Sequence, residues 1–222
     1  MPILSYILAA LGAYLLGSIP TGFLVAKAKG IDIRKTGSGN IGATNAMRVL
    51  GKPAGIVVLL LDALKGYAAV AWLAPMLYNL MEPHYFGLAS GFAAASVALQ
   101  MNFKVIAGVC AVLGHNYTCW LKFKGGKGIA TTAGVYLALA PWGLLIALGA
   151  FMLVIVLTRY VSVGSIAAAI ALPIAVYSTQ NNDLLNIVSL MLGVMAIYKH
   201  KSNIQRLMAG TENRLGNKKG SK

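Results

Sequence analysis

The chain has 222 residues, of which 58% are hydrophobic and only 11% are charged. This composition excludes an ordinary soluble domain and indicates a protein that crosses a membrane several times. The formal net charge is +14, from 19 basic and 5 acidic residues, which in a soluble domain would suggest nucleic-acid binding. Here the basic residues gather in a few loops and a tail between apolar runs. We therefore expect the positive-inside rule and anionic ligands, and no nucleic-acid partner.

The apolar runs indicate where the chain crosses the bilayer. They cover about 3–26, 54–80, 84–121, 129–158, 162–178 and 184–198. A helix needs roughly 20 residues to cross the hydrocarbon core, so these runs do not correspond one-to-one to spans. The basic clusters decide the count, because an even number of crossings must separate two neighbouring cytoplasmic clusters. These clusters lie at 27–52, at 122–127, at Arg159 and at 199–222.

This constraint predicts an all-α fold with seven transmembrane helices, the N-terminus outside and the C-terminus cytoplasmic. The first run crosses inward, and 54–80 and 105–121 go out and back. Residues 129–158 then form a hairpin of two short helices bent near Pro141, and 162–198 form a second hairpin that turns at Asn181-Asn182-Asp183. We expect a single membrane-embedded domain over 1–222, with a disordered basic tail at 215–222.

Two features fit this scheme less simply. Residues 84–101 are rich in Ala, Gly and Ser, and we interpret them as a helical extension or an interfacial element on the outer face. Lys104, close by, is an exception to the charge bias. Cys110 and Cys119 lie in one apolar run and make neither a disulfide framework nor a metal site. No metal and no cofactor are expected.

The polar segment Thr36–Arg48, between the first two apolar runs, is the strongest candidate for a ligand site. Its glycines permit backbone N–H groups to turn together into an anion-binding nest, and Arg48 offers a planar fork that suits phosphate. A solvated turn with topology-setting charges is the alternative. The segment also fits G-x-G-x-x-G, with Asp62 twenty residues beyond, but it does not lie between a strand and a helix, so a dinucleotide site is excluded. The candidate residues are Gly37, Ser38, Gly39, Asn40, Gly42, Thr44, Asn45 and Arg48.

Asp62 and Lys65 lie about one helical turn apart inside the second apolar run. Charges inside a membrane cost roughly 2.5–3.5 kcal/mol each on insertion scales, so they are usually paired or functional. Two interpretations stay open. The residues form a mutual i,i+3 pair, or Lys65 reaches into a phosphate site.

A second glycine-rich segment follows Gly114-His115-Asn116. The segment Phe123–Gly128 is not a Walker A loop, because Leu121 and Gly128 occupy positions that would need Gly and Ser or Thr. It places Lys127 at the N-terminus of a helix predicted to begin near Ile129, where phosphate is favoured. A lysine-capped turn is the alternative. Three interpretations of His115 stay open: a core residue whose hydrogen bonds are satisfied, a general base, or a phosphate ligand.

The tail supplies the last group of polar residues. His200, Asn203 and Arg206 recur at three-residue steps, which predicts one side of a helix that continues the last span. A basic helix resting on anionic headgroups is the alternative. Ser162 and Ser165 follow Arg159 on the same predicted face. All these polar groups are thus expected to converge on the cytoplasmic side.

In order and spacing, these motifs resemble the bacterial acyl-phosphate:glycerol-3-phosphate acyltransferases, the PlsY family. The resemblance covers nearly the whole chain. It rests on Ser38–Arg48, Asp62-Ala63-Leu64-Lys65-Gly66, Gly114-His115, Lys122–Gly128 and His200 with Asn203–Leu207. It implies a seven-span inner-membrane enzyme, with its site on the cytoplasmic face, that makes lysophosphatidic acid in the first step of phospholipid synthesis. It also implies acyl phosphate and glycerol-3-phosphate as substrates, with a soluble phosphate:acyl carrier protein acyltransferase supplying the donor.

The resemblance also implies roles for individual residues. Ser38 and Arg48 match the family's essential first motif, and Gly125–Gly128 match its glycerol-3-phosphate loop. His200 and Asn203 match the active residues of the third motif, and Glu212 matches its structural acid. The segment 84–101 looks longer than the family's usual connection.

The candidate site is then complete. The catalytic candidates are Ser38, Arg48, His115, Lys127, His200 and Asn203. The substrate- and phosphate-binding candidates are Gly37, Gly39, Asn40, Gly42, Thr44, Asn45, Lys65, Gly125, Gly126, Gly128, Ser162, Ser165 and Arg206.

Acyl phosphate is already activated, so the glycerol hydroxyl can attack its carbonyl directly, helped by positioning and charge stabilisation. No carboxylate stands beside His115 or His200 in a motif, so either a histidine or the departing phosphate accepts the proton. An organophosphate transporter is the rival class, although the polar groups do not cluster at the midplane.

Overall fold

The computed structural model describes residues 2–81 and 93–216 of the chain. Every regular element within these two ranges is helical. The elements are α1 (Pro2–Ser18), α2 (Thr21–Lys27), the 3₁₀ turn η1 (Ile33–Lys35), α3 (Ala43–Leu50), α4 (Lys52–Ala68), the π-helical turn η2 (Ala69–Leu73), α5 (Ala74–Met81), α6 (Ala93–Asn116), the 3₁₀ turn η4 (Cys119–Leu121), α7 (Ile129–Leu139), α8 (Pro141–Thr158), α9 (Val161–Thr179), α10 (Asp183–Lys199) and α11 (Lys201–Met208). The chain divides into two compact units, the first ending at Leu139 and the second beginning at Ala140.

Five helical segments within the described ranges are long and apolar enough to cross a membrane, or six if the bent pair α10–α11 is one span. They are Ile3–Lys27, Lys52–Leu80, Val97–Leu121, Pro141–Thr158 and Val161–Thr179. The apolar helix α7 is shorter, with 11 residues. The protein is therefore an all-helical, multi-pass membrane protein, as predicted.

The break predicted near Pro141 and the hairpin predicted to turn at Asn181-Asn182-Asp183 are confirmed. At the break, α7 ends at Leu139, Ala140 leaves helical geometry with φ of −150°, and Pro141 opens α8, a position where proline costs no helical hydrogen bond. In the hairpin, Asn182 caps α10 by accepting a 2.8 Å hydrogen bond from the Leu185 N–H.

The segment 84–101 is described only in part. Residues 93–101 are the beginning of α6, which continues without a break to Asn116, so they are a helical extension of the following span. Residues 84–92 lie outside the described residues, as do positions 217–222 of the expected tail. Lys104 lies within α6 and is partly exposed.

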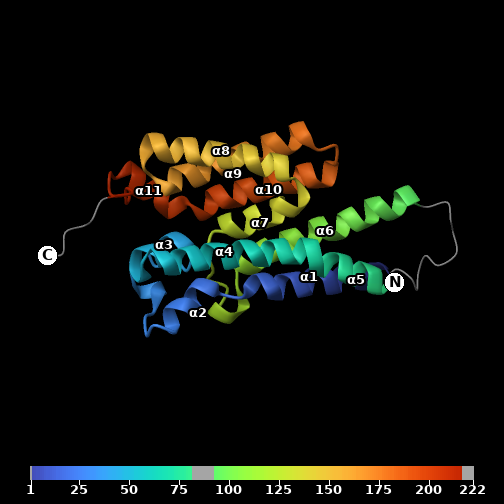
Figure 1. Ribbon diagram of the computed structural model, residues 1–222, viewed down its shortest axis with the longest axis horizontal. Helices are drawn as coiled ribbons and strands as arrows, with labels where there is room; N and C mark the ends of the chain where they lie inside the picture. Colours follow the sequence, from blue (N-terminus) through green and yellow to red (C-terminus); the bar gives the residue numbers. More distant parts are fainter. Residues whose placement is uncertain (1, 82–92, 217–222) are drawn as a thin grey trace. The chain divides into compact units, whose positions relative to one another are not determined.

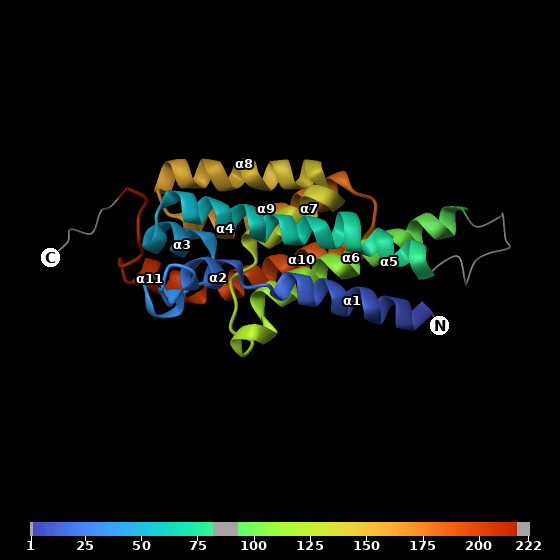
Figure 2. The same cartoon turned by 60° about the horizontal axis from the view of Figure 1, so that its bottom comes forward.

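Close helix contacts at glycine build the first unit (Figures 1 and 2). Helices α1 and α6 run side by side, and a Cβ on Gly17 would collide with the backbone of Ala111. Across the unit, α4 packs against α7, where a Cβ on Gly66 would collide with the Thr131 carbonyl oxygen. Such small-residue contacts allow membrane helices to approach closely. They hold α1, α4, α6 and α7 in one bundle.

The first span is interrupted. Helix α1 ends at Ser18 and α2 begins at Thr21, with Ile19 and Pro20 between them. Proline cannot donate a backbone hydrogen bond, and the residue before it is biased away from helical geometry. The break exposes the Ile19 carbonyl to a partner outside its own helix.

The second unit contains α8 to α11. Helix α9 packs against both α8 and α10. Small residues again allow close approach, and a Cβ on Gly193 would crowd the Ala169 carbonyl.

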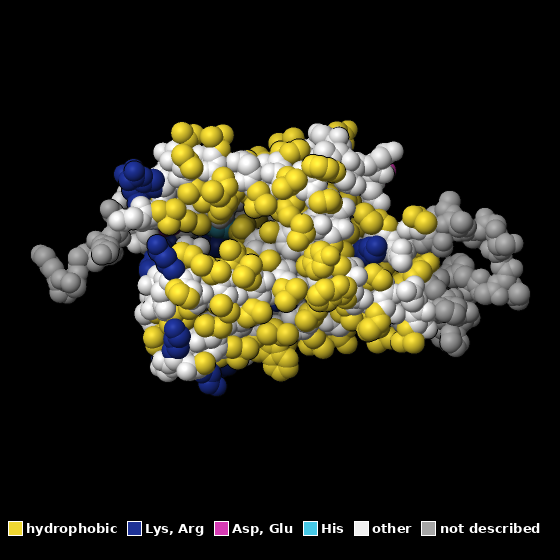
Figure 3. Space-filling view, in the orientation of Figure 1, with side chains coloured by type: hydrophobic (Ala, Val, Ile, Leu, Met, Phe, Trp, Pro, Cys, Tyr) yellow, Lys and Arg dark blue, Asp and Glu magenta, His cyan; other side chains and the backbone are white. Residues whose placement is uncertain are grey.

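Large apolar side chains cover most of the outer surface that is visible in Figure 3. Leu60 on α4 is 62% exposed and Trp142 on α8 is 69% exposed, as expected where lipid is the solvent. Over the first unit, Lys and Arg side chains gather at the end of the bundle that carries α2 and α3 (Figure 3). This is the end at which the loop before α3 lies (Figure 1).

Candidate active site

The segment Thr36–Arg48 is a loop only as far as Gly42, because Ala43–Leu50 form helix α3. Ser38 is exposed in the loop, and Arg48 is exposed in the last turn of α3. The helix places the guanidinium and the loop hydroxyl in one compact segment.

Asn45 organises this loop rather than facing a ligand. Its side chain is buried, with 2% of the residue exposed. Its Nδ2 lies 2.8 Å from the Asn40 carbonyl oxygen and 3.0 Å from that of Thr36, and its Oδ1 accepts a 2.8 Å hydrogen bond from the Ser38 N–H. The Asn45 amide, which the sequence offered as a donor for phosphate, is thus used by the loop itself.

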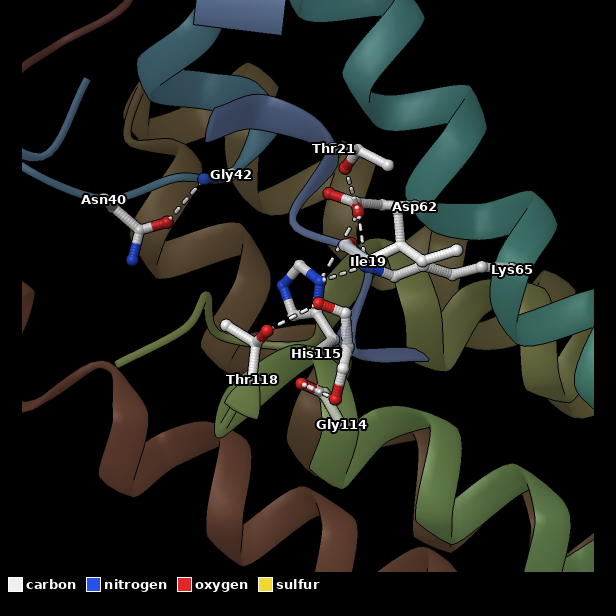
Figure 4. A network of polar contacts seen from close by, with 10 residues as sticks. Ile19, Thr21, Asn40, Gly42, Asp62, Lys65, Gly114, His115 and Thr118 are labelled. Atoms are coloured by element: carbon white, nitrogen blue, oxygen red, sulfur yellow. Dashed lines mark hydrogen bonds and ion pairs between the residues drawn. The ribbon is translucent and has the colours of Figure 1, made fainter. Parts of the chain in front are cut away.

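The predicted anion nest is also partly occupied by internal hydrogen bonds. The Gly42 N–H donates to Asn40 Oδ1 at 2.8 Å (Figure 4), and the Gly39 N–H donates to the Thr36 carbonyl at 3.1 Å. Gly37 and Gly39 have φ values of +65° and +72°, a region that favours glycine. The groups left facing outward are chiefly side chains, namely Ser38, Thr44 and Arg48, all of which are exposed.

Asp32 precedes the loop and holds the other nearby arginine. Arg34 donates to both carboxylate oxygens of Asp32, from Nε at 2.9 Å and from Nη2 at 2.8 Å. This hydrogen-bonded guanidinium lowers the pKa of Asp32 to about 2. Arg34 also lies 4.7 Å from the centre of the Phe23 ring. Arg34 is therefore held by protein groups on two sides, whereas Arg48 extends from α3.

The predicted i,i+3 pair is confirmed inside the first unit (Figure 4). Lys65 Nζ lies 2.8 Å from Asp62 Oδ1, and both side chains are nearly inaccessible. The same ammonium group donates at 2.9 Å to the carbonyl oxygen of Ile19, in the break between α1 and α2. Its third contact, at 2.9 Å, is Nδ1 of His115. Since an ammonium group has three protons, this geometry favours the pairing interpretation of Lys65 over direct phosphate binding.

The network also brings a carboxylate to His115 that no local motif contains. Asp62 Oδ1 lies 3.4 Å from His115 Nδ1. Thr21, which sequence reasoning did not select, donates to the same oxygen at 2.5 Å. The available signal was the Pro20-Thr21 break opposite a buried acid that needed partners.

The glycine segment before α7 packs directly against the end of α6. The Gly126 N–H donates to the His115 carbonyl at 3.0 Å, and the Gly125 N–H donates to that of Asn116 at 3.2 Å. A Cβ on Gly126 would collide with the His115 imidazole. Helix α7 begins at Ile129, as predicted, and half-buried Lys127 lies just before it. Gly128, between them, has φ of +82°.

In the second unit, predicted residues surround Glu212. Its Oε1 accepts from Ser162 Oγ at 3.0 Å and from Asn203 Nδ2 at 2.7 Å, and its Oε2 accepts from Arg206 Nε at 2.7 Å. Burial opposes ionisation of this carboxylate, but the three donors outweigh burial and hold the pKa of Glu212 below its ordinary value. Asn203 and Arg206 therefore support the acid that follows them.

His200 does not lie on a straight continuation of the last span. It stands between α10 and α11, which are bent by 50°, so the helix predicted to continue the last span is present but bent at His200. His200 is buried, and its Nδ1 lies 2.7 Å from the Ala196 carbonyl oxygen. Ser165 is buried too, and its hydroxyl donates to the Val161 carbonyl at 2.9 Å.

Within each unit, predicted residues from distant parts of the sequence meet. The first unit joins the loop of Ser38 and the loop of Lys127 to one core formed by α4 and α6. The second gathers Ser162, Asn203 and Arg206 around one carboxylate. The expected convergence of all these groups on a single ligand stays a prediction. Within 2–81 and 93–216, no group of three His, Cys, Asp or Glu side chains is arranged to hold a metal.

Comparison with known proteins gives the chain a family. The sequence model of the family described as "Glycerol-3-phosphate acyltransferase" matches residues 7–210. A glycerol-3-phosphate acyltransferase from Geotalea daltonii is 45% identical over 211 residues, covering 94% of this chain and 97% of the relative. A crystal structure of PlsY (YgiH), an integral membrane glycerol 3-phosphate acyltransferase, in its glycerol 3-phosphate form covers 96% of both chains, with a TM-score of 0.78 and 37% identity. Its lysophosphatidic acid form gives 0.76 and 36%, again over 96% of both chains. The chain belongs to the glycerol-3-phosphate acyltransferase family.

Proposed function

We propose that this protein transfers a fatty acyl group from acyl phosphate to the sn-1 hydroxyl of glycerol-3-phosphate. The products are lysophosphatidic acid and phosphate, in the first step of phospholipid synthesis. The observation that carries the proposal is the likeness, over 96% of both chains, to a structure in its glycerol 3-phosphate form. The related structure in its lysophosphatidic acid form supports lysophosphatidic acid as the product.

The reaction needs anion binding and positioning more than covalent help from the protein. The sn-1 oxygen attacks the acyl carbonyl carbon, the bond from that carbon to the phosphate oxygen breaks, and inorganic phosphate leaves. We assign phosphate binding to Ser38, Arg48 and Lys127, whose donors suit anionic oxygens. Other proposed contributors are Thr44 and Asn40 of the first unit and Ser162, Ser165, His200, Asn203 and Arg206 of the second.

Histidine geometry narrows the choice of proton acceptor. Lys65 donates to Nδ1 of His115, so a neutral His115 carries its proton on Nε2 and has no lone pair left for a base. At His200, Nδ1 faces a carbonyl oxygen, which only accepts, so a neutral ring carries its proton on Nδ1. We therefore propose that His200 or the departing phosphate, rather than His115, accepts the proton.

The donor is tested directly with detergent-purified protein. Glycerol-3-phosphate is supplied with palmitoyl phosphate, palmitoyl-CoA or palmitoyl acyl carrier protein, and lysophosphatidic acid and phosphate are quantified. We expect turnover with palmitoyl phosphate and background rates with the other two. Turnover only with a thioester overturns the donor assignment, and binding of glycerol-3-phosphate without turnover favours the transporter. The position of the acyl chain on the product tests the sn-1 assignment.

We also propose seven spans in one acyltransferase domain, with the N-terminus outside and the C-terminus and active site on the cytoplasmic side of the bacterial inner membrane. The seventh crossing is α7, which alone would rise only about 16 Å at 1.5 Å per residue. We propose that the non-helical segment before α7, which is hydrogen-bonded to the end of α6, supplies the remaining length of this crossing. A fluorescent protein fused to the C-terminus should fluoresce in the cytoplasm, and a periplasmic reporter there should be inactive. The reverse result would exclude this orientation.

The donor assignment carries a partner with it. Another enzyme has to make acyl phosphate from inorganic phosphate and the acyl thioester of acyl carrier protein, which releases the carrier thiol, and we propose a soluble phosphate:acyl carrier protein acyltransferase as that supplier. Membrane lipid surrounds the acyl chain in this scheme. Reconstitution of the two enzymes in vesicles should convert acyl carrier protein thioester into lysophosphatidic acid, and neither enzyme alone should do so.

A further inference from the structure

One carboxylate oxygen, Oδ1 of Asp62, joins three separate parts of the first unit (Figure 4). It accepts from Thr21 Oγ1 at 2.5 Å and from Lys65 Nζ at 2.8 Å, and it lies 3.4 Å from His115 Nδ1. All four residues are buried. A buried pair of charges is costly to separate, because either partner alone would remain uncompensated in a medium of low polarity. The network therefore holds the segments that it touches in fixed positions relative to one another.

On one side, the network holds the start of α2, which packs against the loop of Ser38. Thr21 is the first residue of α2, and a Cβ on the next residue, Gly22, would collide with the carbonyl oxygen of Ile41 in that loop. Lys65 holds the same part of the chain by donating at 2.9 Å to the Ile19 carbonyl in the helix break. The position of the loop on α2 thus depends on the Asp62 carboxylate.

On the other side, the network holds His115, which packs against the loop of Lys127. Since Lys65 can only donate, Nδ1 of His115 must accept, and the neutral ring carries its proton on Nε2. The imidazole lies so close to Gly126 that a Cβ there would collide with Nε2. The Gly126 N–H is bonded to the His115 carbonyl as well. Ring orientation and loop position are therefore fixed together.

We propose that Asp62 is a positioning residue that sets the spacing between the Ser38 loop and the Lys127 loop. It acts through Thr21 on one side and through Lys65 and His115 on the other, without touching substrate. The proposal rests on the proposed function, because it assigns both loops to phosphate binding. It also assigns Lys65 to the support of the site rather than to the ligand.

Kinetics of four variants test the proposal. A displacement of about 1 Å at a reacting group can cost about 100-fold in rate, so Asp62→Asn and Lys65→Met should lower kcat/KM for glycerol-3-phosphate by about that factor. Thr21→Val removes only the contact to α2, so its kcat/KM for glycerol-3-phosphate should fall by about 10-fold on the same reasoning. Lys104→Met removes another lysine from a membrane helix and is the matched control, with an expected change of less than about twofold.

The double variant Asp62→Asn/Lys65→Met separates positioning from folding. It leaves no unpaired buried charge, so its melting temperature should recover toward that of the wild type. Its activity should stay low, because His115 and the Ile19 carbonyl have still lost their donor. Activity within about threefold of wild type would overturn the proposal. If Asp62→Asn does not fold, Thr21→Val and the double variant give the same decision.

A second readout does not depend on turnover. Imidazole ¹⁵N spectra of the protein in micelles should show His115 as the neutral Nε2–H tautomer, with its signals assigned by their loss in His115→Gln. In Lys65→Met this tautomer preference should disappear. A wild-type Nδ1–H tautomer or a protonated ring would overturn the proposal. Failure of the proposed function would give a different result. Wild-type protein would then not turn over palmitoyl phosphate, while its spectra would still show the Nε2–H tautomer of His115.

Discussion

The Ser38 backbone N–H donates a 2.8 Å hydrogen bond to Oδ1 of Asn45, seven residues further along the chain. Asn45 is buried in α3, and its Nδ2 donates back to carbonyls of the same loop. One amide side chain therefore fixes the backbone on which the exposed Ser38 hydroxyl stands. The loop is thus held by hydrogen bonds within the protein, and such preorganisation lowers the entropy lost on binding.

Asn45→Ala should damage the loop and the activity together. Each hydrogen bond lost is worth about 0.5–1.5 kcal/mol, and buried groups left unpaired cost more. We expect a fall in stability of about 2–4 kcal/mol by this reckoning and a large rise in KM for glycerol-3-phosphate. Thermal unfolding and steady-state kinetics measure the two effects.

The matched control is Asn186→Ala in α10. Among the described residues, Asn186 Oδ1 is buried without a hydrogen-bond partner, so its removal should change stability by less than about 0.5 kcal/mol. Equal losses for the two variants would contradict the role given to Asn45.

Gly126→Ala should lower activity, because the added Cβ would collide with the His115 imidazole, which Lys65 holds in place. Overpacking of this kind costs about 1–3 kcal/mol. In Gly149→Ala, on α8, the Cβ meets no atom within 4 Å, and alanine is the better helix former by about 0.5–1 kcal/mol. Melting temperatures should thus move in opposite directions, and a neutral Gly126→Ala would argue against the close packing of this loop.

Arg48→Lys should reduce kcat/KM for glycerol-3-phosphate by about 10- to 100-fold. A lysine keeps the charge but loses the planar pair of donors, and hydrogen bonds to charged groups are worth about 1.5–3 kcal/mol. Arg214→Lys is the control, since that guanidinium lies 5.1 Å from the centre of the Tyr160 ring and has no assigned part in the site. Wild-type kinetics for Arg48→Lys would remove Arg48 from the phosphate contacts.

Glu212 should make stability depend on pH in the acid range. Its folded-state pKa is lowered from the ordinary value of 4.5, so its contribution is fully present above about 4.5 and is lost as the pH falls through the folded value. Glu212→Gln cannot lose a charge. The wild-type melting temperature should therefore fall more steeply than that of Glu212→Gln as the pH is lowered from 5 toward 3. Parallel curves would show that this carboxylate does not carry the dependence.

His200→Ala should leave the pH dependence of kcat unchanged if the departing phosphate accepts the proton, which is our expectation. Loss of a buried side chain at the bend should still lower the rate by disturbing α10 and α11. A rate–pH profile separates the two effects, because removal of a general base abolishes the acid limb. Disappearance of that limb in His200→Ala would make His200 the base.

The sequence by itself determined the features that local patterns control. Apolar runs and basic clusters predicted a multi-pass helical membrane protein. Pro141 located the break between α7 and α8, the Asn181–Asp183 turn located the hairpin of α9 and α10, and the start of α7 at Ile129 was correct. The Asp62–Lys65 pair was also accessible, because residues three apart meet on one face of a helix.

Only the tertiary structure decided which partners these groups take. Thr21 meets Asp62 across 41 positions, and Lys65 meets His115 across 50, contacts that no local periodicity specifies. The same holds for the bend at His200 and for the donors around Glu212, because both depend on how separate helices pack. The binding of phosphate by this loop stays a prediction, but the Asn45 amide is bonded to carbonyls of its own loop, because a buried polar side chain takes the partners that burial brings to it.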